Sequence, residues 1–252
     1  RTLGSLAATW KTKYKKIFEP LVPGFIFVKY NDPKALENAI SKQTAAVMIE
    51  PIQGEGGINV PKKGYLKQVE KLCKKHKILL IVDEVQSGNG RTGKFFAFKH
   101  ENIKPDIVTA AKGLANGVPI GVCIAKKGLD FHPGDHGSTF GGNNLSCAAA
   151  IATISYIENK KVMKNVETVG NYFKKELEKL KAKYKFIQEV KGKGLMLAMK
   201  LNKKGQNIVN ECLKKGLLIN CAADYNIRFL PPLTITKKEV DQCIKILDKV
   251  LQ

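Results

Sequence analysis

Short continuous runs of apolar residues recur through the first half of the chain, and they predict strands. Three of them, Ala45–Glu50, Ile78–Val82 and Ile107–Ala111, are rich in β-branched and aliphatic residues. Such runs are typical of strands buried on both faces of a parallel sheet. A helical apolar period over Gly64–Lys77 joins the first two, and Val118–Ala125 predicts a further strand. This alternation predicts an α/β fold with a mainly parallel sheet flanked by helices.

Weaker signals precede these runs. Phe25–Tyr30 predicts a short strand. Asn31 or Asp32 is a suitable N-cap for a helix from Pro33 to about residue 41, with proline in the first turn. These elements add to the predicted first domain, which spans residues 1–155; an apolar helix expected at about Leu145–Glu158 crosses its end.

The pattern changes from Asn159 onward, where a long Lys- and Glu-rich helix runs to about Lys183. Thr236 and Glu239 have the spacing of a capping box and predict the start of the last helix. Between them, strands are expected at 186–190, 195–200, 217–222 and 227–230, with a helix at about 206–215. We therefore predict a small α+β domain over residues 156–252.

Charge and cysteine content narrow the functional classes. The 252 residues carry 43 basic and 22 acidic side chains, a net charge of +21, and only three of the basic residues are arginine. The lysines are spread along the chain without interleaved aromatic residues, which favours a solvated surface over a nucleic-acid interface. No apolar run reaches the length of a membrane span. The six cysteines form no CxxC motif and have no metal-ligand spacing with the four histidines, which is typical of a reduced, cytoplasmic protein without structural zinc.

Two side chains at strand ends suggest the chemistry. Asp83 follows one apolar run and Lys112 follows the next. Ligands of open α/β sheets bind at the carboxyl ends of parallel strands. Either residue alone is more often a cap or a surface charge. An aldehyde cofactor with a ring nitrogen requires both an amine, to form a Schiff base, and an acid, to pair with the ring. Together they predict pyridoxal 5'-phosphate and transamination.

Five motifs then resemble one family. They are EPIQGEGG from Glu50, LIVDEVQSGNGRTG from Leu80, PDIVTAAKGLANGVPIG from Pro105, HGSTFGGN from His136 and RFLPPL from Arg228. In order and spacing the chain resembles the class III pyridoxal-phosphate aminotransferases, which have the fold type I of PLP-dependent transferases. The resemblance implies transfer of an amino group from N-acetylornithine, or a related ω-amino acid, to 2-oxoglutarate.

The resemblance also implies roles for individual residues around the cofactor. Lys112 would be the catalytic Schiff-base lysine, and Asp83 would bond the pyridine nitrogen. Val85 would pack on one face of the ring, and Gln86 would bond its phenolic oxygen. Glu50 would support the site near Gln86.

Phosphate and substrate contacts follow from the same resemblance. Thr139, with Ser138 beside it, would reach the phosphate of a partner subunit's cofactor, so that a homodimer shares its active sites. Arg228 and Arg1 would bind substrate carboxylates. Glu55 would pair with Arg228 when one class of substrate is bound and release it for the other.

Three further expectations complete the interpretation. For Arg91, we expect loop structure or a subunit contact rather than substrate binding. Roughly the N-terminal third of the family's length has no counterpart here, so we expect little or no activity from residues 1–252 alone. The alternatives are a donor such as ornithine, 4-aminobutyrate or succinyldiaminopimelate, a mutase or decarboxylase on the same fold, and an inactive basic protein that binds polyanions.

Overall fold

The computed structural model describes residues 2–252, and its internal contacts divide the chain into two units, 1–44 and 45–252. The first unit contains three helices and a 3₁₀ turn: α1 (Leu3–Ala7), α2 (Thr12–Lys15), η1 (Lys16–Phe18) and α3 (Pro33–Ala39). The α3 helix confirms the expected start, because the Asp32 side chain accepts a hydrogen bond from Ala35 N–H at 2.9 Å.

The strand expected at Phe25–Tyr30 is wrong. The structure has no regular element between η1 and α3, and Phe25, Ile26 and Phe27 are exposed. Aromatic and β-branched residues favour a strand only where a neighbouring strand supplies hydrogen bonds and a face to pack against. In the described part of the chain, no strand pairs with this segment.

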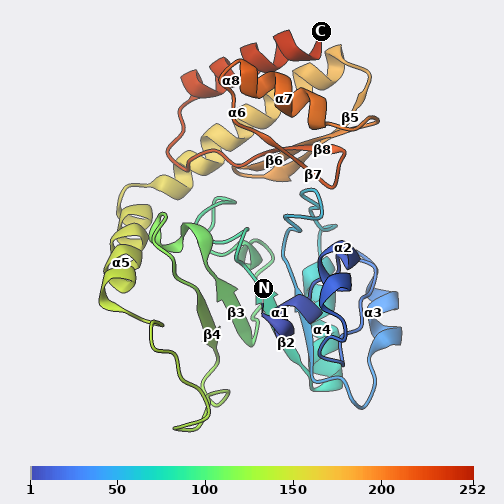
Figure 1. The fold of residues 1–252 in the computed structure, drawn as a ribbon, viewed down its shortest axis with the longest axis vertical. Helices are drawn as coiled ribbons and strands as arrows, with labels where there is room; N and C mark the ends of the chain where they lie inside the picture. The colour runs from blue at the N-terminus through green and yellow to red at the C-terminus, as the bar shows by residue number, and fades with distance from the viewer. Residues whose placement is uncertain (1) are drawn as a thin grey trace. The chain divides into compact units, whose positions relative to one another are not determined.

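The second unit begins with a four-stranded sheet in the order β1-β2-β3-β4 (Figure 1). Its strands are β1 (Ala46–Ile49), β2 (Leu79–Asp83), β3 (Ile107–Ala110) and β4 (Val122–Ala125). The first three are parallel, and β4 runs antiparallel to β3. The connection from β1 to β2 contains α4 (Tyr65–His76), and the connection from β2 to β3 contains η2 (Ala97–His100). The mainly parallel sheet flanked by helices is thus confirmed.

The strands of this sheet are covered less completely than their sequences predict. Buried and partly exposed residues alternate along β2 and β3, and Met48 of β1 is 51% exposed. The expectation of burial on both faces is therefore wrong for these strands in this chain. A continuous apolar run indicates that both faces favour burial, but the elements that cover each face are set by tertiary packing and not by the strand's own sequence.

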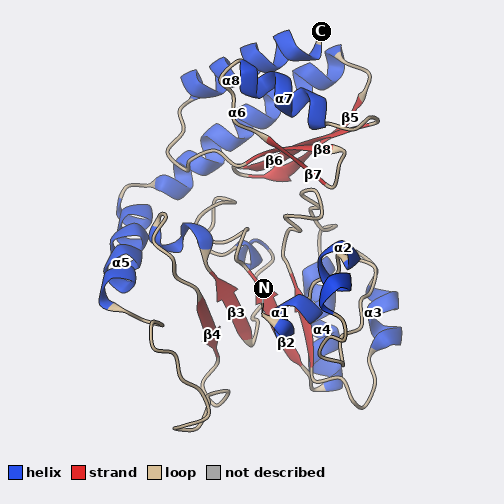
Figure 2. Cartoon of the chain, viewed as in Figure 1, coloured by secondary structure: helices blue, strands red, loops and turns tan. Residues whose placement is uncertain are grey.

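A second sheet follows in the order β5-β6-β8-β7 and is entirely antiparallel. Its strands are β5 (Ile187–Lys193), β6 (Met196–Leu201), β7 (Asn220–Ala222) and β8 (Asn226–Phe229). Figure 2 shows α6 (Val162–Lys183), α7 (Gln206–Lys214) and α8 (Lys237–Leu251) together on one side of this sheet. The capping box is confirmed: Thr236 Oγ1 accepts from Glu239 N–H, and the Glu239 carboxylate accepts from Thr236 N–H.

The largest hydrophobic core lies between these helices and the second sheet. It is built from completely buried side chains such as Val166, Leu177, Met199, Ile227 and Leu247. The proposed domain boundary near residue 156 falls within α5 (Asn144–Asn159), the helix that precedes α6. Along β8, Ile227 and Phe229 point into this core, so the alternation of side chains places Arg228 on the opposite face of the sheet.

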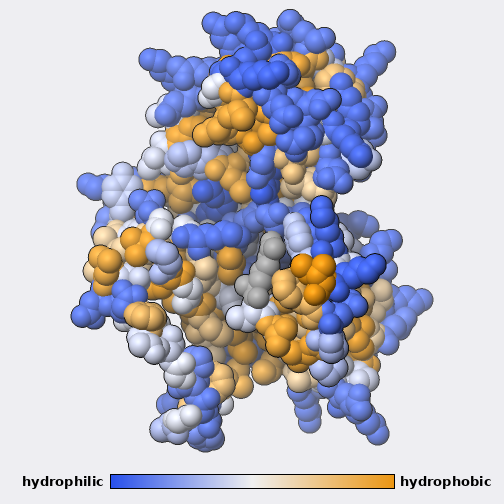
Figure 3. Space-filling model, viewed as in Figure 1, coloured by the Kyte–Doolittle hydropathy of each residue, from blue (hydrophilic) through white to orange (hydrophobic). Residues whose placement is uncertain are grey.

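Polar side chains cover the outer surface of the C-terminal helices (Figure 3). The α6 and α8 helices carry ten of the chain's forty lysines, and some of these form ion pairs such as Lys179–Glu176 and Lys183–Asp248. Across residues 2–252, no helix combines the length and the apolar character needed to cross a bilayer.

Candidate active site

Asp83 lies at the carboxyl end of β2 and is held there by two donors. Its Oδ1 accepts hydrogen bonds from Val85 N–H at 2.9 Å and from the Thr109 hydroxyl at 3.2 Å. Thr109 is the residue opposite Asp83 in the β2–β3 register. Within residues 2–252, Asp83 Oδ2 has no hydrogen-bond partner. One carboxylate oxygen is therefore fixed by the fold while the other remains able to accept a hydrogen bond.

Lys112 lies just beyond the end of the neighbouring strand. It opens the 3₁₀ turn η3 (Lys112–Ala115) with a φ of 52°, in the left-handed region that residues with a Cβ rarely adopt. Leu114 and Ala115 of the turn pack against Ala150 of α5, which anchors it. The Lys112 side chain is exposed, and the described residues offer it no hydrogen bond or salt bridge. Its ammonium group is thus available for chemistry.

Glu50 joins these two strand ends to the glycine-rich loop that follows β1. Its Oε2 accepts a hydrogen bond from Gly54 N–H at 2.9 Å. Burial raises the pKa of Glu50, the Gly54 hydrogen bond opposes that shift, and the Asp83 carboxylate adds to it; smaller contributions come from Lys112 and Glu55. Through Gly54 the Glu50 carboxylate is hydrogen-bonded to the loop that carries Glu55.

Arg228 on β8 reaches the same region from the second sheet. Its Nη1 donates to Glu55 Oε1 at 2.7 Å and to Gln86 Oε1 at 3.1 Å. Its Nε donates to Asn220 Oδ1 at 3.0 Å. The Arg228 side chain is 8% exposed and the Glu55 side chain 55%. Asn220 therefore holds the buried Arg228 side chain in place, while the Glu55 carboxylate that Arg228 binds is exposed to solvent.

The loop that carries Glu55 is bound closely to its surroundings. A Cβ on Gly54 would lie 2.3 Å from the Gln86 side-chain amide, so only glycine lets Gln86 approach the loop. Ile52 and Ile58 pack against Met196 and Ala198 of β6. Because the second sheet supports both this loop and Arg228, it sets the position of one relative to the other.

Predicted phosphate contacts lie elsewhere. Ser138 and Thr139 are exposed in the segment between β4 and α5, which extends away from the first sheet before it returns (Figure 1). Ser138 Oγ accepts from Gly141 N–H at 2.9 Å, and the described residues show no contact between either hydroxyl and Asp83 or Lys112. Arg1, the other predicted carboxylate ligand, lies outside the described residues.

Arg91 has the structural role expected of it. Its Nη1 donates to the carbonyl oxygens of Leu195 and Pro231, which ties the loop after β2 to the second sheet. Burial lowers the pKa of Arg91 to about 10. Sequence reasoning missed Thr109 and Asn220, which hold Asp83 and Arg228. The register of the strands could have indicated Thr109, since it is the partner of Asp83 across the sheet.

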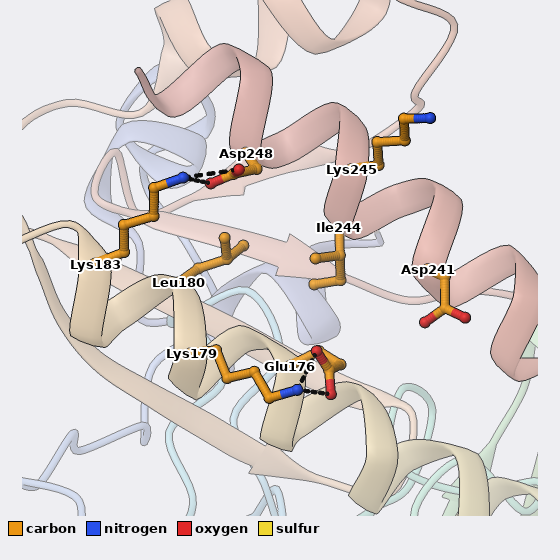
Figure 4. Close-up of a pocket in the computed structure, with 8 residues that line it drawn as sticks. All are labelled: Glu176, Lys179, Leu180, Lys183, Asp241, Ile244, Lys245 and Asp248. Carbon is orange, nitrogen blue, oxygen red and sulfur yellow. Dashed lines mark hydrogen bonds and ion pairs between the residues drawn. The ribbon is translucent and has the colours of Figure 1, made fainter.

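A groove between α6 and α8 contains none of these residues. Its volume is about 370 Å³, and Lys183, Asp248, Lys179 and Glu176 line it with exposed ion pairs (Figure 4). Exposed ion pairs of this kind contribute little to stability and do not define a chemical site. The strand ends of the first sheet therefore remain the candidate site.

Comparison with known proteins agrees with this assignment. The profile of the family "Aminotransferase class-III" matches residues 1–251. Acetylornithine aminotransferase of Methanocaldococcus jannaschii is 52% identical over 254 residues, covering 99% of this chain and 63% of the relative. The chain thus spans a little under two thirds of the length of this relative.

Solved structures of aminotransferases are also similar to this chain. An ornithine aminotransferase from Toxoplasma gondii, whose active site is described as partly occupied by PLP, superposes with a TM-score of 0.95 at 37% identity. That match covers 100% of this chain and 61% of the other. Acetylornithine aminotransferase from Elizabethkingia anophelis gives a TM-score of 0.86 at 42% identity, covering 91% and 60%.

The fold is therefore that of the PLP-dependent transferases of fold type I. Within that class, the chain belongs to the class III aminotransferase family.

The cofactor of this family, pyridoxal phosphate, suits the side chains present. Asp83 keeps one carboxylate oxygen without a protein donor, as a protonated ring nitrogen requires. Lys112 offers an amine that the described residues do not pair, as an aldehyde requires. The donor set at the two strand ends therefore fits the cofactor's ring and aldehyde.

Proposed function

We propose that the complete protein is an aminotransferase that moves an amino group from N-acetylornithine to 2-oxoglutarate, a step of arginine biosynthesis. The Arg228–Glu55 pair beside Gln86 carries this proposal. An enzyme that alternates between an amino donor and a dicarboxylate acceptor needs an arginine that binds a carboxylate of one substrate. When the other substrate is bound, that arginine must pair with a carboxylate of the protein instead. Glu55, more than half exposed, is able to leave Arg228 when a substrate carboxylate replaces it.

The strand-end residues have complementary roles in this proposal. Bound pyridoxal phosphate supplies an electron sink for the bonds at the substrate Cα. Asp83 would hold the ring nitrogen protonated, and Val85 and Gln86 would contact the ring face and the phenolic oxygen. Lys112 would bind the cofactor and then move a proton to and from the substrate Cα. Glu50 would support Gln86 by holding Gly54, against which the Gln86 side chain packs.

Subunit association belongs to the same proposal. Ser138 and Thr139 would contact the phosphate held by a partner subunit, so the working unit would be a homodimer in the cytoplasm. The exposure of this segment supports the idea, as do large exposed apolar side chains on either side of it, including Phe131, Phe140 and Leu145. Residues 1–155 would form part of the cofactor-binding domain and 156–252 a small C-terminal domain.

Ornithine is the second candidate donor, because the ornithine aminotransferase of T. gondii superposes on all of this chain. The donors 4-aminobutyrate and succinyldiaminopimelate would use the same carboxylate site. A mutase or decarboxylase is less suitable, since neither needs a dicarboxylate site that opens and closes. A polyanion-binding role would not need Lys112 and would survive its substitution by alanine.

A donor panel on the complete protein tests the proposal. We expect the highest kcat/KM with N-acetylornithine when 2-oxoglutarate is the acceptor. Ornithine as the best donor would shift the assignment within the family. Absence of amino transfer from every donor on the panel, in protein shown by absorbance to hold the cofactor, would reject it.

A further inference from the structure

A buried amide contacts the backbone immediately before Lys112. Asn89 lies in the loop after β2, is 6% exposed, and donates from Nδ2 to the Ala111 carbonyl oxygen at 2.8 Å. Ala111 precedes Lys112 and connects it to β3. The contact therefore crosses between the two strand ends that carry Asp83 and Lys112.

The Ala111 carbonyl oxygen accepts a second hydrogen bond, from Leu114 N–H at 3.2 Å. A carbonyl oxygen has two lone pairs, and here both are used. The two donors fix the plane of the peptide group between Ala111 and Lys112. That plane forms one side of the N–Cα torsion φ of Lys112, which is 52° and unfavourable for a residue with a Cβ. Asn89 thus acts on the backbone angle that sets where the Lys112 side chain starts.

The orientation of the Asn89 amide is determined by this contact alone. Its Oδ1 is buried and has no hydrogen-bond donor among residues 2–252. With the amide turned over, oxygen would face the Ala111 carbonyl oxygen, so the donor must be Nδ2. A buried acceptor without a donor costs more than one neutral hydrogen bond returns. Asn89 is therefore poorly explained as a stabilising residue.

We propose that Asn89 is a positioning residue for Lys112: its amide holds the Ala111–Lys112 peptide in the orientation that aims the lysine amine at the cofactor. This inference rests on the proposed role of Lys112 in the transaminase. It assigns to Asn89 no contact with substrate or cofactor. Loss of the amide would leave the fold intact and let the lysine start from a less favourable backbone angle.

A second explanation must be separated from this one. Asn89 has a φ of 54°, and asparagine tolerates that region better than most residues. Asn102 has the same backbone preference, with a φ of 53°, but it is exposed and its side chain has no hydrogen bond in the described structure. The two asparagines therefore share a backbone conformation and differ in burial and in the amide contact.

The test compares Asn89→Gly with Asn102→Gly in the complete, cofactor-loaded protein. Glycine accepts the left-handed backbone in both, so the comparison removes the backbone preference and leaves the effect of the buried Asn89 side chain with its contact to Ala111. We expect Asn89→Gly to lower kcat by about 10- to 100-fold, the size of effect that a small misplacement of a reacting group produces. KM for 2-oxoglutarate should change less than about twofold, because ground-state binding is not altered. Asn102→Gly should match the unsubstituted protein.

Hydrogen exchange on the cofactor-free protein provides a readout that does not depend on activity. Peptides covering residues 110–115 should exchange faster in Asn89→Gly and unchanged in Asn102→Gly, with the remaining peptides unaffected. If Asn89→Gly does not fold, Asn89→Asp keeps the side-chain volume and removes the donor, and the same expectations apply.

Unchanged exchange at 110–115, or faster exchange with an unchanged kcat, would overturn the inference. A lower Tm with unchanged kcat in the folded fraction would assign Asn89 a purely structural role and would overturn it too. Absence of amino transfer in the unsubstituted protein would instead reject the proposed function, and the exchange experiment would then decide the backbone contact by itself.

Discussion

The two sheets of residues 45–252 are covered to different extents. In the second sheet, the central strand β8 is buried at every position and the central strand β6 at all positions except Lys200, whereas the edge strands β5 and β7 keep exposed positions. In the first, β2 and β3 alternate between buried and partly exposed residues, and β4 has no fully buried residue. The second sheet has three helices packed on one of its faces, and the core between them is continuous.

This difference separates stability from chemistry. The second sheet provides a dense core, where volume and apolar character decide which residues are tolerated. The first provides the strand ends with Asp83 and Lys112, and in the proposed function access for ligands matters more there than burial. Arg228 is the exception, because it is fixed in the second sheet and directed toward the first. Substitutions in the two sheets should therefore affect different measurements.

Replacing Lys112 should have the largest effect of all, and on activity only. In the proposed function Lys112 supplies both the amine that binds the cofactor and the base, so we expect Lys112→Ala to lower kcat by about 10³-fold or more. The free energy of unfolding should change by less than about 0.5 kcal/mol, since the side chain is exposed and makes no hydrogen bond or salt bridge within residues 2–252. Steady-state kinetics and urea titration measure the two quantities. Lys71→Ala, an exposed lysine on α4, is the control, and residual turnover near the unsubstituted level would disprove the assignment.

A substitution in the core of the second sheet should instead affect the free energy of unfolding. Leu177 of α6 is completely buried in its core, and Leu177→Ala should reduce the free energy of unfolding by about 2–5 kcal/mol through lost burial and a cavity. Leu213, on α7, is 57% exposed, and Leu213→Ala should cost less than about 0.5 kcal/mol. A similar loss of stability for the two substitutions, measured by urea titration, would mean that the helices do not form the core described.

Local sequence rules predicted the elements better than the contacts between them. Asp32 and the Thr236–Glu239 capping box act within three or four residues, and both were found correctly. The segment Phe25–Tyr30 was predicted wrongly because a strand depends on a partner that local sequence does not specify. The antiparallel orientation of β4 likewise depends on the path of the chain after η3.

The site was predicted in the same uneven way. The neighbouring positions of Asp83 and Lys112 followed from the pattern, because each follows an apolar run that forms one of two paired strands; their chemical roles stay a prediction. The contact between Asn89 and Ala111 joins residues 22 positions apart, and the contact between Arg228 and Glu55 joins residues 173 apart. Family resemblance suggested the second pair. Nothing in the sequence pattern suggested Asn89, because an asparagine in a glycine-rich loop is usually a turn residue.

Arg228 tests the connection between the two sheets. In Arg228→Lys the positive charge remains, but the planar fork that contacts Glu55, Gln86 and Asn220 is lost. We expect kcat/KM for 2-oxoglutarate to fall by about 10- to 100-fold, corresponding to about 1.4–2.8 kcal/mol. The reverse exchange at an exposed position, Lys200→Arg on β6, serves as the control. An unchanged kcat/KM for 2-oxoglutarate would remove Arg228 from the carboxylate site.

The smallest expected effect concerns the pH dependence of stability on the side of the first sheet. His100 Nε2 lies 3.1 Å from both the carbonyl and the hydroxyl oxygen of Thr92. Burial, assisted by the nearby Lys193 charge, lowers the pKa of His100 to about 4 from its usual 6.5. Because the folded-state pKa lies below the unfolded one, the contribution of His100 is complete above pH 6.5. It is lost as the pH falls toward 4, since the unfolded state binds the proton more readily.

Urea titrations at pH 7 and pH 4.5 measure this contribution. His100 is only half-buried and solvent screens the charge, so we expect the unsubstituted protein to lose roughly 1 kcal/mol more than His100→Gln over this range. His76→Gln, at an exposed histidine at the end of α4, should retain the pH dependence of the unsubstituted protein. If His100→Gln and the unsubstituted protein lost equal stability between the two pH values, His100 would not be held neutral by the fold. Water would then reach the loop after β2 around Thr92, unlike the completely buried core of the second sheet.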